Sequence, residues 1–499
     1  STSVQDWHFV LRRLGSAGIA ATVVVATHIF IEMTVAELKA LQSQPCDAGG
    51  PTKMYGTTKI KQADHDDENT VPPHGISLFL ATVFVVGGVA GIGILALPQS
   101  IVLTGWSGIF LIVASAFASG FCGWKLGACW TILEERWEEY RGHVRDPYPS
   151  IAFRAYGRWA RMGTSAIQIM GLFGYGSVFL LLSAELVMDV TKQFSGGKVN
   201  LYFCYWLIII AVGLGLLMQL GTPKDFGFAA FGAMGATAVA FVIIVVVCCI
   251  RMANRDAAWP SHPPSIGLAG YFRGFGTIMF SYGGAAMFPT IQNDMKERSR
   301  FPMAVAYATI GLVALYVVMA ALGYLTFGNH VNANILLSIG DGAVSIAVQL
   351  LFIVHLVTAF LIIINPMCQE VEEHLGVPKE FTWKRLVLRV IIMVALLLTT
   401  ETVPHFGKVL PLVGSFMVGL TTFILPCVFY YKLCSQKSPD WKDRKLPTWE
   451  KVVLLVTLIA GLIGTIAGTV ASIEDLVKPG SFALPCFIDP NVLPSGGGH

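Results

Sequence analysis

The chain has 499 residues, of which 54% are hydrophobic and only 13% are charged, and its formal net charge is +3. Soluble domains carry about 25% charged residues, so most of this chain would aggregate if it were exposed to water. The composition predicts an all-α polytopic membrane protein and excludes a cytosolic enzyme, a nucleic-acid-binding module and a secreted disulfide scaffold. The small net charge indicates no polyanionic partner.

Eleven apolar runs bounded by charged residues are candidates for membrane spans. A helix needs about 20 apolar residues to cross the hydrocarbon core of a bilayer. The ninth run is short. The first two are separated only by Gly105 and Trp106, so we expect a tight antiparallel pair. The runs cover residues 77–104, 107–133, 163–190, 201–220, 226–250, 268–292, 303–327, 343–367, 386–400, 409–431 and 452–473.

Basic residues in the connections predict the orientation, because they concentrate on the cytoplasmic side. If the first run passes outward, most loop lysines and arginines fall on the inner side. We therefore expect a cytoplasmic, partly disordered tail at 1–76, a transmembrane domain at 77–473 and a non-cytoplasmic tail at 474–499. Segment 17–36 favours an amphipathic surface helix, with a twelfth span or a signal-like segment as alternatives.

Two of the runs contain residues that interrupt helices. The first run includes GGVAGIGILALP at 87–98, and the sixth includes FSYGGAAMFP at 280–289. Inside a membrane such residues are tolerated where the backbone lines a cavity or is covered by protein. The interruptions lie five helices apart, an odd number that reverses the direction of the second copy. This spacing predicts a five-plus-five inverted repeat with broken helices 1 and 6 and an eleventh helix appended.

The chemistry of these breaks suits a zwitterion. The N-terminus of a half-helix offers backbone N–H groups and a positive dipole end to a carboxylate, while freed carbonyls accept from an ammonium group or bind a cation. We expect a small amino acid, or a similar compound, at the two breaks. The alternative is that the glycines only permit close helix packing. The predicted substrate-binding residues are Gly88, Gly91, Ile92, Gly93, Tyr175, Phe280, Ser281, Tyr282 and Gly283.

At the two breaks the chain resembles the amino acid/auxin permease family, also called the amino acid transporter transmembrane family. GIGILALPQSIVLTGW at 91–106 is similar to the family's first-helix motif, and FSYGGAAMFPTIQNDMKERSRFP at 280–302 to its sixth-helix motif and following loop. The resemblance implies a fold like that of the sodium-coupled neurotransmitter symporters, with alternating access. Many relatives have asparagine at the place of Val89 and histidine at that of Ala285, so the loss of both polar groups favours neutral substrates.

Ionisable side chains inside a membrane are costly and mark candidate ion-coupling sites. Glu185 lies four residues before Asp189 on the third run, although near its outer end either carboxylate could simply reach headgroup water. His355 and Thr358 lie one turn apart on the eighth run. The resemblance implies a sodium site there, formed by first-span carbonyls and the Thr358 hydroxyl. For His355 the alternative is a hydrogen bond to a neighbouring helix.

The remaining polar features are interpreted as structural. Lys125 and Arg273 lie near the ends of their runs, so we expect both to extend to the membrane interface. Cys204 and Cys486 are both expected on the outer side, where a disulfide is permitted in an oxidising compartment. We find no catalytic or metal-binding constellation, which indicates no enzyme and no cofactor beyond a coupling H⁺ or Na⁺.

Together these patterns predict a secondary active transporter of small neutral amino acids driven by a proton or sodium gradient. Its membrane is the plasma membrane or a lysosomal or vesicular membrane, with a cytoplasmic N-terminus. The expected partners are the amino acid and the lipid bilayer, without nucleic acid or an obligate protein partner. The alternatives are a vesicular or lysosomal amino acid transporter, an amino acid sensor with little flux, and a channel.

Overall fold

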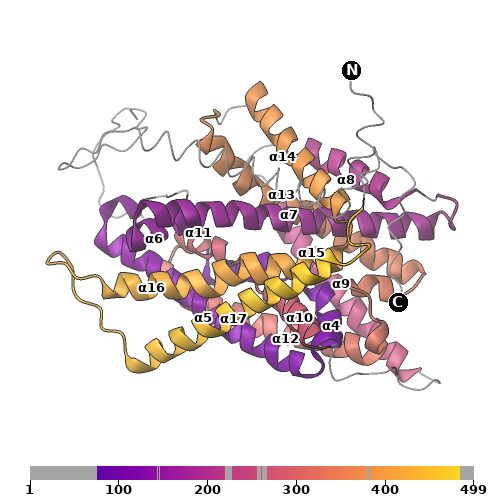
Figure 1. The fold of residues 1–499 in the computed structure, drawn as a ribbon, viewed down its shortest axis with the longest axis horizontal. Helices are drawn as coiled ribbons and strands as arrows, with labels where there is room; N and C mark the ends of the chain where they lie inside the picture. Colours follow the sequence, from indigo (N-terminus) through magenta and orange to yellow (C-terminus); the bar gives the residue numbers. More distant parts are fainter. Residues whose placement is uncertain are drawn as a thin grey trace. The chain divides into compact units, whose positions relative to one another are not determined.

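The computed structural model describes residues 76–142, 144, 146–199, 201–219, 227–254, 260, 267–378 and 382–483. The regular elements of this part of the chain are helices (Figure 1). The predicted tail helix at 17–36 lies outside the described residues, as does most of the C-terminal tail.

All eleven predicted runs contain helix where the structure describes them. Within the described residues, seven helices are long and apolar enough to cross a membrane, and the bent pair α3 (Leu78–Val89) and α4 (Gly93–Thr104) can form an eighth span. The three other runs contain α8 (Phe203–Leu217), α10 (Gly267–Ser281) and α14 (Trp383–Thr402). The long spans are α5 (Ser107–Arg136), α7 (Arg158–Phe194), α9 (Gly227–Ala253), α12 (Phe301–Phe327), α13 (Ala343–His374), α15 to α16 (Phe406–Ser435) and α17 (Thr448–Val477).

The two predicted interruptions are present as breaks in the first and sixth spans. The axes of α3 and α4 differ by 54° across the first break. The second break follows the end of α10 and is succeeded by the 3₁₀ turn η3 (Ala285–Met287) and α11 (Phe288–Asn293). Gly284 has a φ of 146° there, a conformation that residues with a side chain rarely adopt. Glycine therefore allows the chain to leave the helix at this point.

Short connections define the two ends of the bundle. Gly105, with a φ of 65°, lies in the short connection between α4 and α5. The two spans do not form the expected tight pair, because α4 packs mainly against α10 and α12. Helix α6 (Pro147–Tyr156) follows α5 in the chain and lies at one end of the bundle in Figure 1. We call this the α6 end. The opposite end carries η6 (Ile335–Ser338) and is called the η6 end.

Lys125 does not extend to the membrane interface, so that expectation was wrong. Its side chain is 2% exposed and forms an ion pair with Glu450, in the first turn of α17. The ammonium nitrogen also lies 3.7 Å from the ring centroid of Trp124, and the Tyr430 hydroxyl donates to Glu450 at 3.3 Å. An opposite charge and hydrogen bonds from other helices compensate the cost of burial. The sequence did not indicate this partner because it lies 325 residues away.

Other charged side chains within the bundle are also neutralised between helices. Arg389, 1% exposed, joins α14 to α13 through Glu372 Oε1 at 2.6 Å and Asn365 Oδ1 at 3.2 Å. Arg273 at the start of α10 is 21% exposed and pairs with Asp475 on α17, with 2.7 Å between Nη1 and Oδ2. These contacts tie the spans together at points where an unpaired charge would be costly.

A disulfide includes Cys204, near the start of α8. Seven other cysteines of the described residues are free thiols, and the second cysteine of the bridge lies outside the described residues. Cys486, which was considered together with Cys204 from the sequence, lies outside the described residues.

Replacing Glu450 tests the buried ion pair. Glu450→Gln should lower the free energy of unfolding by about 3–5 kcal/mol, because it leaves the Lys125 ammonium buried without its countercharge. Glu135→Gln is the matched control, since its pair with Arg444 is exposed and should contribute less than about 1 kcal/mol. Unfolding of the purified protein in detergent measures both. Equal stability of the two variants would contradict the assignment.

Candidate functional site

The breaks of the first and sixth spans lie directly against each other. A β-carbon placed on Gly93 would lie 2.6 Å from the Cα of Ser281. No real side chain fits at that distance, so glycine is required for this approach. The structure thus brings together two of the predicted substrate-binding residues, and it also shows that close helix packing is one reason for the glycine.

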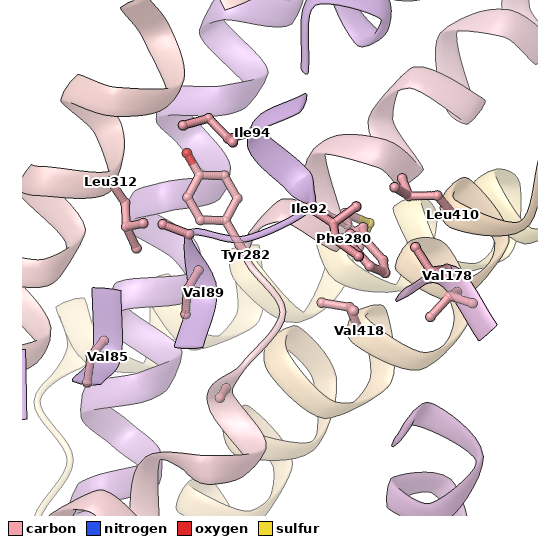
Figure 2. Packing of buried hydrophobic residues seen from close by; sticks show 14 of the residues in the cluster. Val85, Val89, Ile92, Ile94, Val178, Phe280, Tyr282, Leu312, Leu410 and Val418 are labelled. Carbon is pink, nitrogen blue, oxygen red and sulfur yellow. The ribbon is translucent and has the colours of Figure 1, made fainter. Parts of the chain in front are cut away.

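Tyr175 from α7 covers the sixth-span break. A β-carbon on Gly283 would overlap the Tyr175 hydroxyl group. The Tyr175 and Phe280 ring centroids are 5.0 Å apart. Val178 and Val418 lie next to Phe280 in the same apolar cluster (Figure 2). The predicted residues Tyr175, Phe280 and Gly283 therefore form one contact group.

Helix α4 begins at the first-span break, where Ile92 lies beside Phe280 (Figure 2). Ile92 precedes α4 and supplies no side-chain cap. The first N–H groups of a helix lack partners within the helix, and its dipole places positive charge there. The Gly91 amide is already used, because it donates to the Val89 carbonyl at 3.0 Å. The uncapped end at Ile92 and Gly93 is thus the part of this break suited to a carboxylate.

His355 and Gly88 also contact the break region. A β-carbon on Gly91 would lie 3.4 Å from His355 Nε2, and the His355 residue is 4% exposed. A β-carbon on Gly88 would lie 2.7 Å from the sulfur of Met287 in η3. The Thr358 hydroxyl donates to the Val354 carbonyl of its own helix at 2.9 Å. Of the two ion-coupling candidates on α13, His355 and Thr358, the structure places His355 against the first break.

Glu185 belongs to a polar cluster toward the η6 end. Asn334, fully buried ahead of η6, donates from Nδ2 to Glu185 Oε2 at 3.5 Å. One turn along α7, Asp189 accepts from Gln349 at 2.7 Å and from Gln193 at 2.6 Å. The sequence indicated the two acids but missed Asn334 and Gln349, because neither is near the acids in the chain.

Two tyrosines hold the breaks to neighbouring helices. Tyr282 directs its hydroxyl to the Ile112 carbonyl on α5, at 2.8 Å, and its ring lies beside Ile94 and Leu312 in Figure 2. Tyr316 on α12 contacts the Val89 and Ser281 carbonyls through its hydroxyl group. The sequence analysis did not include this residue, although a tyrosine within an apolar span usually requires a hydrogen-bond partner when it is buried. That requirement is the signal that could have identified it.

The sixth-span break also packs against an unusual helix. Residues Gly414–Ile424 form a π-helix between α15 and α16. A β-carbon on Gly414 would lie 2.7 Å from the Cβ of Phe280. Single π-turns are rare in proteins, and those that occur are often found at functional sites. The longer π-helix of this chain lies directly against the predicted binding region.

A small added group tests the contact between the breaks. Gly93→Ala should force the two half-helices apart, with an overpacking cost of about 1–3 kcal/mol. Gly311→Ala is the control, because a β-carbon there meets nothing within 4 Å. The melting temperature in detergent should fall for Gly93→Ala and not for Gly311→Ala. Identical melting temperatures would rule out the close approach.

Comparison with known proteins identifies relatives across most of the chain. Residues 74–473 match the family described as "Transmembrane amino acid transporter protein". Amino acid transporter ANT1 of Arabidopsis thaliana is 24% identical over 409 residues, which are 77% of this chain and 89% of the relative. Amino acid transporter AVT1H of the same plant is 26% identical over 423 residues, with coverage of 81% and 92%.

Two solved structures show a more distant similarity. MhsT in complex with L-phenylalanine has 12% identity and a TM-score of 0.49, covering 79% of this chain and 98% of that one. Mhp1, a nucleobase-cation-symport-1 family transporter, has 13% identity and a TM-score of 0.47, with coverage of 81% and 92%.

Proposed function

Because the chain belongs to the transmembrane amino acid transporter family, and is thus a multi-pass membrane transporter, we propose that it carries small neutral amino acids. Transport proceeds by alternating access around the two broken helices and is driven by a proton or sodium gradient. The observation that carries this proposal is the direct contact of the two breaks at Gly93 and Ser281.

The site supports a zwitterionic substrate with an uncharged side chain. The uncapped N-terminus of α4 at Ile92 and Gly93 suits the carboxylate. The carbonyls of the sixth-span break, at residues 280–284, suit the ammonium group. Ile92, Phe280 and Tyr175 add apolar and aromatic surface, against which a charged side chain would lose hydration without compensation.

Three residues are proposed for ion coupling. For a proton, the acceptor is Glu185, which Asn334 contacts, or His355, which faces the first break. For sodium, the ligands are freed backbone carbonyls with the Thr358 hydroxyl, which would have to leave its bond to Val354. Each alternative makes a different residue essential.

The proposed orientation places the N-terminus in the cytoplasm and the η6 end outside the cell or in a lumen. The Cys204 disulfide supports this direction, because disulfides persist in oxidising compartments. The membrane is the plasma membrane or that of a lysosome or vesicle.

Uptake into proteoliposomes tests the proposed function. The purified full chain should concentrate a labelled neutral amino acid when either a proton or a sodium gradient is imposed, and liposomes without protein should not. Substrate-dependent thermal stabilisation without uptake would contradict transport and indicate an amino acid sensor. Ionic conductance across a planar bilayer would contradict it and indicate a channel.

A carboxylate variant tests proton coupling. If one proton accompanies each substrate, a gradient of one pH unit sustains about tenfold accumulation. Glu185→Gln should abolish that accumulation while preserving exchange of labelled for unlabelled substrate, because exchange needs no net proton movement. Asp341→Asn, which alters an exposed acid near η6, should accumulate substrate normally. Normal accumulation by Glu185→Gln would exclude Glu185 as the coupling residue.

A further inference from the structure

The Tyr316 side chain joins the two helix breaks. It is fully buried on α12, the span that follows the sixth-span break. Its hydroxyl oxygen lies 2.7 Å from the Ser281 carbonyl oxygen and 3.0 Å from the Val89 carbonyl oxygen. Ser281 is the last residue of α10, and Val89 is the last residue of α3. A single phenol group thus contacts the C-terminal end of both half-helices.

The Val89 and Ser281 carbonyl groups create a site of negative electrostatic potential within the bundle. The last carbonyls of a helix have no partner within the helix and carry the negative end of its dipole. The Val89 carbonyl also accepts from Gly91, whose amide lies 3.0 Å away. Two converging carbonyls of this kind would attract a small cation if no hydrogen-bond donor lay between them. The Tyr316 hydroxyl supplies that donor with one proton and no net charge.

The phenol is held in this place from its other side. The Tyr316 and Tyr282 ring centroids are 5.2 Å apart in an edge-to-face arrangement. Tyr282 is in turn bound to α5 through its hydroxyl bond to the Ile112 carbonyl, at 2.8 Å. Because both hydroxyls and both rings are engaged, the Tyr316 hydroxyl has little freedom to move unless a break moves with it.

We propose that Tyr316 is a positioning residue that holds the two breaks in register. Its hydroxyl fills the place between Val89 and Ser281 that a cation would otherwise take. The inference rests on the proposed function, because the register of the breaks sets the geometry of the substrate site. It also implies that a coupling sodium ion, if there is one, binds elsewhere in this conformation.

The test removes only the hydroxyl group. Tyr316→Phe should raise the KM for amino acid uptake about fivefold to tenfold, the factor that the loss of one hydrogen bond corresponds to. The control is Tyr148→Phe, because Tyr148 is 1% exposed and donates to a single carbonyl, that of Thr421, at 2.6 Å. The control should change the KM less than about twofold. Equal KM values for the two variants would overturn the proposal.

Sodium provides a second readout that a purely structural tyrosine would not change. Sodium chloride should raise the melting temperature of Tyr316→Phe relative to choline chloride, because the vacated carbonyls can bind the ion. Wild-type protein and Tyr148→Phe should show no such difference. If Tyr316→Phe is unstable, sodium during purification should recover it where choline does not. Equal melting temperatures of Tyr316→Phe in the two salts would refute the proposal that the Tyr316 hydroxyl fills a cation-binding position.

The two proposals can fail separately. If the wild-type protein neither binds nor moves any amino acid, the proposed function fails. The sodium dependence of melting then still decides the role of Tyr316. If wild-type transport is normal and Tyr316→Phe matches Tyr148→Phe in both readouts, only the role of Tyr316 fails.

Discussion

Backbone groups that a broken helix leaves unpaired must find partners within the protein, because lipid offers none. The structure meets this constraint by placing its two broken spans against each other. Gly93 allows the backbones to approach at Ser281, and Tyr316 supplies a donor to carbonyls of both. The α4 N-terminus at Ile92 lacks a side-chain cap. Tyr316 thus satisfies the Val89 and Ser281 carbonyls, and the amide end at Ile92 and the other carbonyls of the sixth-span break stay suited to a substrate.

The same constraint explains how charged side chains are accommodated. Lys125 is paired with Glu450, and Arg389 with Glu372, so each charge is balanced by a residue of another helix. Such pairs add less to stability than their Coulomb attraction suggests, but the loss of one partner is costly. They therefore specify which helices are neighbours. The Lys125 side chain, a lone basic residue in an apolar run, is thus explained by an acidic partner on another helix and not by extension to the membrane interface.

The predictions that succeeded concern local patterns. Apolar length located the spans, and glycines followed by proline located the breaks in the first and sixth of them. Gly105 marked the short connection between α4 and α5. Each of these features depends on residues within about one helix length, since propensity and hydropathy act over that range. The prediction for Lys125 failed because its partner is distant in the chain.

The sequence by itself determined that this chain is an all-helical membrane protein with two broken spans, because bilayer thickness and backbone hydrogen bonding leave few alternatives. Only the tertiary structure decided which groups meet at the breaks. Tyr316 is 227 residues from Val89, and Asn334 is 149 residues from Glu185. Polar contacts depend on position to within a fraction of an ångström, and such positions follow from the packing of all the helices together.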